Sequence, residues 1–423
     1  MALSRRLALL VSTALFTTAV YGVDIEEQDL QSLRDWINSK RMITVKELGG
    51  QLSISGDVHA EMQASSATKN GIAQRGHGTG TPNNQYDVEF NLMVDYRTER
   101  SWLAARLRFD EDAGIFNDNF GSGKSDKLKL ERAYWGYRLV DGDRHTMDLE
   151  VGRRGPLTLM FDTKVQFLSN FDGVSFKDSY AVDNVGDLYY QLGAFIVNEK
   201  KDQAAYVGEA GILNLANTGF YTKYSLIDWN TKEHITKCPP QFRFIVSQLL
   251  LGYKWIPQIL DRPVVIYAAG LYNHRARPFK FGFEKGEGGK PDLPAVNVTH
   301  GRKANYGGYL GFTVGALKLA GDWVFDANYQ VVAAQCIPDF DVSGIGMGSK
   351  SDHGFYFSGT KRVTDEDNIE GNVNYRGFEL TLQYLISNNL NLFQQWRQSI
   401  TLDDHIGPFR RFKQYEVDFI YSF

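Results

Sequence analysis

Arginine side chains are the groups in this sequence whose spacing first suggests chemistry. Arg106 and Arg108 alternate with apolar residues in the stretch SWLAARLRFD, and Arg132 and Arg138 alternate in the same way in the stretch that follows it. A guanidinium group stays charged and holds a rigid fork of donors, so such a face is suited to orienting polar solutes. The alternative is that each arginine only pairs with a carboxylate across neighbouring strands, the candidates being Asp87, Glu89 and Asp148.

Signals for enzymatic chemistry are weak. The stretch NFGSGKS resembles a phosphate-binding loop, but Asp118 stands where that motif needs its first glycine, so a polar loop is favoured. No HExxH or GxSxG motif occurs, and a hydrolase would have to use pairs such as Asp352–His353 or Asp404–His405. Acidic stretches lack the spacing of an EF-hand. We therefore predict no catalytic residue, no cofactor and no metal site.

Composition favours strands over helices. The 423 residues include 41 Gly, 11 Pro, 22 Tyr and 27 Phe, and the mean hydropathy is −0.33. Many aromatics and glycines in a chain of negative hydropathy are typical of alternating strands joined by polar turns. The net charge of −4 gives no basic footprint, so we expect no nucleic-acid partner.

The N-terminus has the pattern of an export signal. Arg5 and Arg6 precede an apolar run and small residues follow, which predicts a signal peptide over 1–22, although a membrane anchor is the alternative. Residues 23–50 show helical periodicity, and we expect a short helical segment outside any membrane. Two cysteines, Cys238 and Cys336, lie in proline-flanked stretches of an exported chain, so either a disulfide or two free thiols is open.

From residue 51 onward the apolar period is two. In YDVEFNLMVDYR, one face is apolar and the other carries Asp87, Glu89 and Asp95, so half of this strand must contact water. The rest of the chain divides into a total of about 16 such strands, of the length that a tilted membrane strand needs. Apart from the N-terminal signal, no stretch approaches the ~20 apolar residues of a spanning helix. The links between strands alternate between short and long, which favours a barrel over a soluble all-β protein.

Three short motifs then resemble one family. LEVGRRG ends one strand, FDGVSF opens the next, and FIYSF closes the chain. Together with the strand rhythm, they resemble bacterial outer-membrane porins, both general-diffusion and solute-selective ones. The resemblance implies an all-β transmembrane antiparallel barrel over 51–423, with a constriction loop near 154–170 folded into the lumen. It adds possible pore residues to the four arginines above, namely Arg153, Arg154, Asp162, Lys164 and Asp172.

The resemblance also implies location and partners. The chain would reside in the bacterial outer membrane, contact its lipid, and assemble as a homotrimer. The terminal residues Phe419, Tyr421 and Phe423 would be the signal that the barrel assembly machinery reads. The expected activity is passive diffusion of ions and small hydrophilic solutes through a water-filled channel. The alternatives are a phosphate- or carbohydrate-selective porin, an outer-membrane hydrolase, and an adhesin barrel.

Overall fold

A computed structural model describes most of the chain after residue 50. The described residues are 50–76, 83–112, 128–155, 162–167, 170–199, 203–230, 244–276, 280–284, 293–299, 303–338, 342–343, 345, 356–357, 370–371, 373–404 and 409–423. The proposed signal peptide and the N-terminal helical segment both lie outside them. Among the described residues, no helix is long and apolar enough to cross a membrane.

The described elements are all strands. In chain order they are β1 (Gln51–Lys69), β2 (Ile72–Ala73), β3 (Asn84–Arg97), β4 (Ser101–Asp112), β5 (Leu128–Asp141), β6 (His145–Arg154), β7 (Phe171–Val182), β8 (Gly186–Asn198), β9 (Gln203–Leu215), β10 (Phe220–Asn230), β11 (Phe244–Trp255), β12 (Val264–Asn273), β13 (Lys280–Glu284), β14 (Leu293–Thr299), β15 (Tyr306–Gly315), β16 (Trp323–Val332), β17 (Tyr356–Phe357), β18 (Glu370–Gly371), β19 (Tyr375–Ser387), β20 (Leu390–Thr401) and β21 (Arg410–Ser422).

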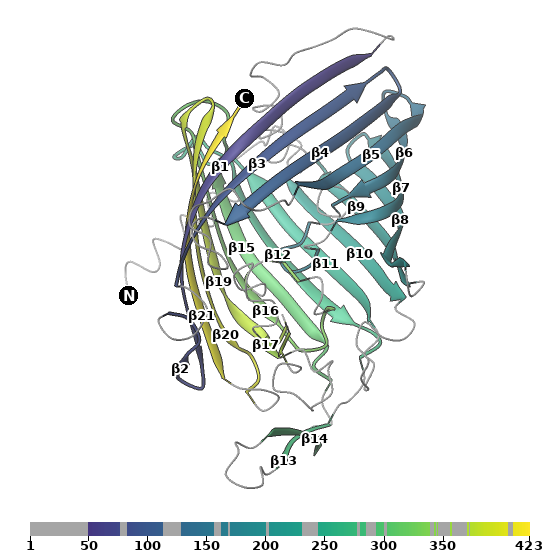
Figure 1. Ribbon diagram of the computed structural model, residues 1–423. Helices are drawn as coiled ribbons and strands as arrows, with labels where there is room; N and C mark the ends of the chain where they lie inside the picture. The colour runs from purple at the N-terminus through teal and green to yellow at the C-terminus, as the bar shows by residue number, and fades with distance from the viewer. Residues whose placement is uncertain are drawn as a thin grey trace, which may run out of the picture.

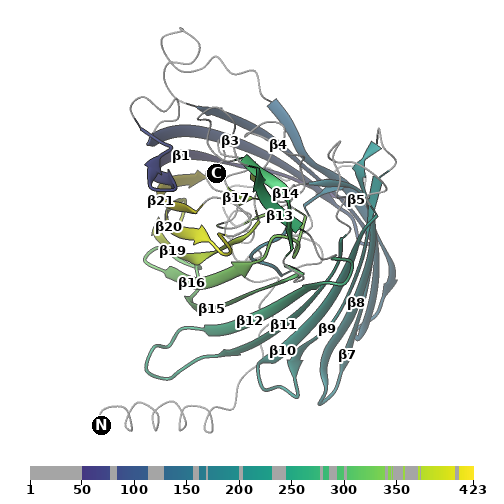
Figure 2. The same cartoon turned by 90° about the horizontal axis from the view of Figure 1, so that it is seen from below.

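Sixteen of the described strands form one closed antiparallel barrel (Figures 1 and 2). Each long strand pairs with the next along the chain, and β21 returns to pair with β1, from Asp57↔Ser422 to Lys69↔Arg410. The pairs β13–β14 and β17–β18 form two separate small sheets that are not paired with the ring, and the two-residue β2 pairs with the end of β1. The all-β barrel of about 16 strands expected from the sequence is therefore confirmed.

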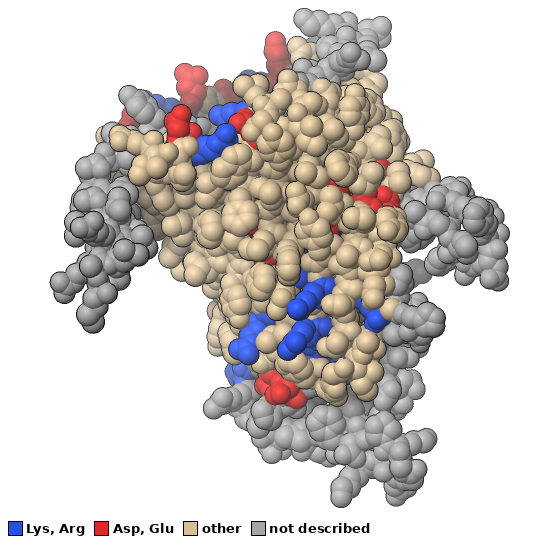
Figure 3. Space-filling view, turned by 90° about the vertical axis from the view of Figure 1, so that its left-hand side faces the viewer, with Lys and Arg blue, Asp and Glu red and all other residues tan. Residues whose placement is uncertain are grey.

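Alternation of side chains gives the barrel two different surfaces. On β1 and β3, the outward set includes Val58, Met62, Val88 and Phe90, all exposed apolar residues. The residues between them point to the lumen and are mostly polar. Figure 3 shows one part of the outer face, β19 to β21 and β1, covered mainly by uncharged residues with Lys and Arg gathered toward the long-loop end. An apolar outside and a polar inside reverse the usual arrangement of a soluble protein.

Several strands, β11 and β12 most clearly, depart from this rule because protein covers their inner face. On β11 and β12, the inward residues Val246, Leu250, Val265 and Leu271 are apolar and buried. They share a core cluster with Val165, Phe167, Ile337 and Val342, which belong to loop segments folded inside the barrel. The apolar runs FIVSQLLLG and PVVIYAAGL are therefore strands that contact apolar groups on both faces.

Changing one outward and one inward residue tests this assignment of faces. Leu382 lies on the outer face in the middle of β19, and Gln383 beside it points to the lumen. In phosphatidylcholine vesicles, we expect Leu382→Arg to lower the free energy of unfolding by about 2–4 kcal/mol, because it places a charge in hydrocarbon. Gln383→Arg is the control and should cost much less. Equal losses in urea titrations of the two variants would contradict the assignment.

Candidate functional site

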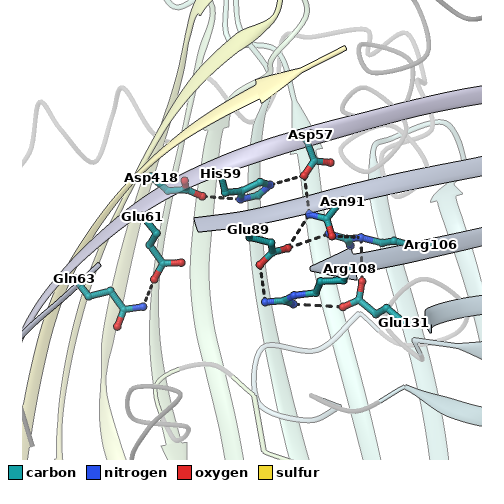
Figure 4. A network of polar contacts seen from close by, with 10 residues as sticks. All are labelled: Asp57, His59, Glu61, Gln63, Glu89, Asn91, Arg106, Arg108, Glu131 and Asp418. Carbon is teal, nitrogen blue, oxygen red and sulfur yellow. Dashed lines mark hydrogen bonds and ion pairs between the residues drawn. The ribbon is translucent and has the colours of Figure 1, made fainter. Parts of the chain in front are cut away.

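A ladder of charged side chains lines the lumen on β3, β4 and β5. The Arg108 guanidinium lies 2.5 Å from a Glu89 carboxylate oxygen and 3.4 Å from Glu131. Arg106 lies 2.9 Å from Glu131 and 3.5 Å from Glu89. Each arginine therefore contacts the same two carboxylates, and the four side chains form a closed set of ion pairs (Figure 4).

The ladder continues across the seam where the barrel closes. Asn91 donates hydrogen bonds of 2.7 Å to both Glu89 and Asp57. The His59 ring then joins Asp57, at 2.6 Å, to Asp418 on β21, at 2.9 Å. The polar network thus runs over five neighbouring strands, β21, β1, β3, β4 and β5, and we call it the polar wall (Figure 4).

An irregularity in β5 brings Glu131 into this wall. The pairing of β4 with β5 shifts between Arg106 and Leu107, so that Arg106 is opposite Arg132 and Leu107 is opposite Leu130. Glu131 is the extra residue of this bulge, and it points toward the two arginines of β4. The extra residue shifts the alternation by one, so that Leu130 faces outward before the bulge and Trp135 and Tyr137 face outward beyond it.

An inner segment, residues 162–167, packs against the opposite side of the barrel. The Lys164 ammonium lies 3.3 Å from Asp326 on β16, which also accepts hydrogen bonds from Tyr267, 2.8 Å, and Thr313, 2.7 Å. Burial lowers the pKa of Lys164, but the neighbouring carboxylates, Asp326 first, outweigh it and the pKa is raised. The ammonium group is therefore held in its charged form.

Backbone contacts fix the same segment in place. The Asp162 carbonyl accepts hydrogen bonds of 2.9 Å from Gln248 on β11 and from Tyr309 on β15. Burial and the nearby Asp326 carboxylate raise the pKa of the Asp162 side chain, although Lys164 opposes this shift. In the order of strands around the ring, β11 to β16 lie across the lumen from β3 and β4 (Figure 2).

A second inner segment, which follows β16, packs on the first. Gln166 forms an isolated bridge with Val342, and the Ser343 amide donates to the Val165 carbonyl at 3.1 Å. Its earlier part is fixed by Asn273, which donates to the Gln335 carbonyl at 2.8 Å. The sequence predicted one inward loop near 154–170. The motifs gave no signal for the second one.

The structure places most of the proposed pore residues inside the barrel, but in separate parts of it. Arg106 and Arg108 lie in the polar wall, and Arg132 is opposite Arg106. Arg154 lies over the Tyr134 ring, 4.5 Å from its centroid, and pairs with Glu150. Asp162 and Lys164 lie in the first inner segment. Arg138 faces inward but lies near the short turn, where it pairs with Asp148 at 2.9 Å.

Arg153 and Asp172 lie on the outer face, so the prediction that they line the pore is wrong. They pair with each other at 2.8 Å, in register with the outward residues of β5 to β8 such as Val174 and Ile196. The sequence-based reasoning took every charge near the Gly-Arg motif as part of the lumen. Strand parity, which places Arg153 beside Val151 in the outward set, would have separated Arg153 from Arg154.

The sequence analysis also left out several members of the wall. Asp57, His59 and Asp418 were not singled out, because they lie at opposite ends of the chain and meet only when β21 pairs with β1. Glu131 and Asp326 were missed as well. Alternation was the available signal, since Asp57 and His59 occupy the polar face of a strand that the sequence identified. Of the His residues weighed for a hydrolase, His353 and His405 lie outside the described residues.

Cys336 is a free thiol, completely buried under β15, so the disulfide considered from the sequence is not formed. Burial raises its pKa. Cys238 lies outside the described residues. At the chain end, Phe419, Tyr421 and Phe423 are exposed on the outer face, with relative exposures of 47%, 52% and 38%.

Comparisons with known proteins give structural matches only. No family model and no curated protein matches the sequence. Among solved structures, OprB of Pseudomonas putida at high pH has a TM-score of 0.48 and 12% identity, covering 88% of this chain and 94% of that one. A triple mutant of Rhodopseudomonas blastica porin has a TM-score of 0.41 and 9% identity, covering 88% of this chain and all of that one (100%).

The packing of the second inner segment can be tested through Cys336. A Cβ added to Gly307 would lie 2.6 Å from the Cys336 sulfur, whereas one added to Gly270 would have nothing within 4 Å. Overpacking of this kind costs about 1–3 kcal/mol. In a Cys238→Ser background, we expect Gly307→Ala to raise the rate of maleimide labelling at Cys336 by roughly tenfold. Gly270→Ala is the matched control. Equal rates in the two variants would contradict the packing.

Proposed function

We propose that the chain is a bacterial outer-membrane porin, a water-filled channel for passive diffusion of ions and small hydrophilic solutes. The observation that carries the proposal is the closed barrel with an apolar outer and a polar inner surface. A closed barrel leaves no unpaired strand edge in the bilayer, and a polar lining suits water. Such barrels reside in the bacterial outer membrane, whose hydrocarbon core would contact the apolar outer surface.

The narrowest part of the passage lies between the polar wall and the inner segments. On one side stand the paired charges of Arg106, Arg108, Glu89 and Glu131. On the other, Lys164 and Asp326 present a second ion pair. We therefore assign the constriction to residues near 154–170 together with the segment after β16. A solute passing there exchanges part of its hydration shell for fixed charges.

The balance of charge in the polar wall favours cations. The wall carries four carboxylates, against two guanidinium groups and one imidazole. The carboxylates belong to Asp57, Glu89, Glu131 and Asp418. Rings of acidic side chains select cations because they hold the counterion close to the path.

The same proposal includes the export of the chain and the assembly of the barrel. Residues 1–22 act as the export signal, and the exposed ending Phe419, Tyr421 and Phe423 is what the barrel assembly machinery reads. The barrels associate as homotrimers in the membrane, in contact with its lipid. These parts of the proposal rest on the sequence resemblance and on the outward position of the terminal aromatic residues.

Planar-bilayer recording of the purified full chain tests the channel. We expect stepwise increases in current, with a current–voltage relation that is close to linear, because an aqueous passage conducts without a transport cycle. A hydrolase or an adhesin barrel would give no such steps. Insertion into the bilayer without any conductance, at several salt concentrations, would reject the porin proposal.

Ion preference tests the role of the wall. The reversal potential under a KCl gradient should show preference for K⁺. Glu89→Gln with Glu131→Gln should lower the ratio of K⁺ to Cl⁻ permeability severalfold, because two arginines then lose their partners. Asp183→Asn, in an exposed turn and paired to Arg144 at 2.7 Å, is the control and should leave the ratio unchanged. An unchanged ratio in the double variant would remove the wall from the selectivity mechanism.

A further inference from the structure

Three cations lie close together on the outer face of the barrel, near its long-loop end. Arg376 on β19 and Arg411 and Lys413 on β21 are all exposed. Within the described residues, none of them forms an ion pair or a side-chain hydrogen bond. Figure 3 shows Lys and Arg gathered at this end of the face, beside a broad surface with few charges. We call these three residues the basic rim.

Strand register places the basic rim in two adjacent rows. Arg376 pairs with Ile400, and Ile400 with Arg411, so the two arginines lie in one row across β19, β20 and β21. Lys413 is opposite Gln398 in the next row. Successive outward residues of a strand are about 7 Å apart. The three positive groups therefore surround one small area.

The row that follows toward the middle of the barrel is aromatic. Trp396 pairs with Tyr415, and both are exposed, at 47% and 40%. Apolar residues continue from there toward the short turns, Phe419 and Leu382 among them. Aromatic girdles mark the boundary between hydrocarbon and headgroups in membrane barrels. The basic rim thus lies at the depth of the headgroups, just outside the hydrocarbon.

We propose that the basic rim is a docking site for the phosphate groups of an anionic lipid in the adjoining leaflet. Arginine forks bind phosphate oxygens in pairs, and lysine adds a point charge. The acyl chains of the same lipid would lie along Trp396, Tyr415 and the apolar rows. The site therefore matches both halves of such a lipid, its charge and its hydrocarbon.

A second copy of the chain fits this surface less well. A two-fold contact through this face would oppose binding, because it places the three cations of one copy against those of the other. In the homotrimer proposed above the contact is heterologous, and it would have to bring acidic side chains of one copy onto the three cations of its neighbour. The phosphate of an anionic lipid instead neutralises the three cations. The experiment below distinguishes such a lipid from a second copy of the chain.

Lipid-dependent quenching of Trp396 tests the proposal. The full chain would be reconstituted in vesicles that mix phosphatidylcholine and phosphatidylglycerol, with bromine on the acyl chains of one lipid at a time. Subtraction of the Trp396→Phe signal isolates Trp396, and Trp135, exposed on the outer face of β5, serves as a reference for insertion. We expect the quenching to show that phosphatidylglycerol is enriched beside Trp396 by roughly fivefold or more over its share of the vesicle lipid. A single cation near an anionic membrane surface contributes about 1 kcal/mol, which corresponds to roughly this factor.

Variants then assign the preference to the basic rim. Combining Arg376→Gln, Arg411→Gln and Lys413→Gln should abolish the enrichment at Trp396 while Trp135 quenching stays unchanged. Arg153→Gln, on the outer face but paired with Asp172, is the matched control and should keep it.

Three results would overturn the proposal. The first is an equal preference for both lipids in the unmodified chain. The second is an enrichment that survives in the triple variant. The third is a Trp396 that neither lipid quenches while both quench Trp135, which would show that a second copy covers this face. Failure of either lipid to quench Trp135 as well would count against the membrane-spanning barrel itself, so the two failures are distinguishable.

Discussion

The pairing of the first strand with the last determines everything else in this barrel. A sheet that stays open has two edges of unpaired amides and carbonyls, and neither edge is tolerated in hydrocarbon. Here the ends meet from Asp57↔Ser422 to Lys69↔Arg410, and the Phe423 amide and carbonyl complete the seam with Gly56 at 2.9 and 3.1 Å. Closure also fixes register, and a slip of one residue would turn the apolar set into the lumen. The His59 bridge from Asp57 to Asp418 crosses this seam, so the polar wall exists only in the closed register.

The lumen is divided into two environments by what covers its wall. Along β1, β3 and β4 the inner side chains are mostly polar, and many of them contact one another, as the ladder around Arg106 shows. Along β11 and β12 they are apolar, because the inner segments bury them as a soluble protein buries its core. The inner segments are therefore held by hydrophobic packing as well as by the Lys164–Asp326 pair. In the channel proposed above, this asymmetry puts the passage on the side of the polar wall.

The periodicity of the sequence was sufficient for the barrel, and less so for its interior. Strands such as β3 were predictable because apolar and polar residues alternate from Tyr86 to Arg97, with Met93 as the exception. The second inner segment was not, since its residues around Ile337 pack by tertiary contact and carry no period of their own. Only one of the two carboxylate partners of Arg106 and Arg108 was predictable from the sequence. Glu89 was among the candidates, but Glu131 enters through a bulge, and bulges are set by local pairing that alternation does not reveal.

The place of a charged residue in the alternation of its strand decides whether it faces the lumen or the outer surface. Arg153 and Arg154 are neighbours in sequence, yet one lies outside the barrel, paired with Asp172, and the other lies inside over Tyr134. A cation that faces the bilayer region must be neutralised or lie near the headgroups, because hydrocarbon does not solvate it. Arg153 meets this requirement through its carboxylate partner. Arg376, Arg411 and Lys413 meet it through their position beyond the aromatic row, and in the proposed lipid site a phosphate group supplies the charge that neutralises them. The same outer face would thus contain one cation neutralised by protein and one group of cations neutralised by lipid.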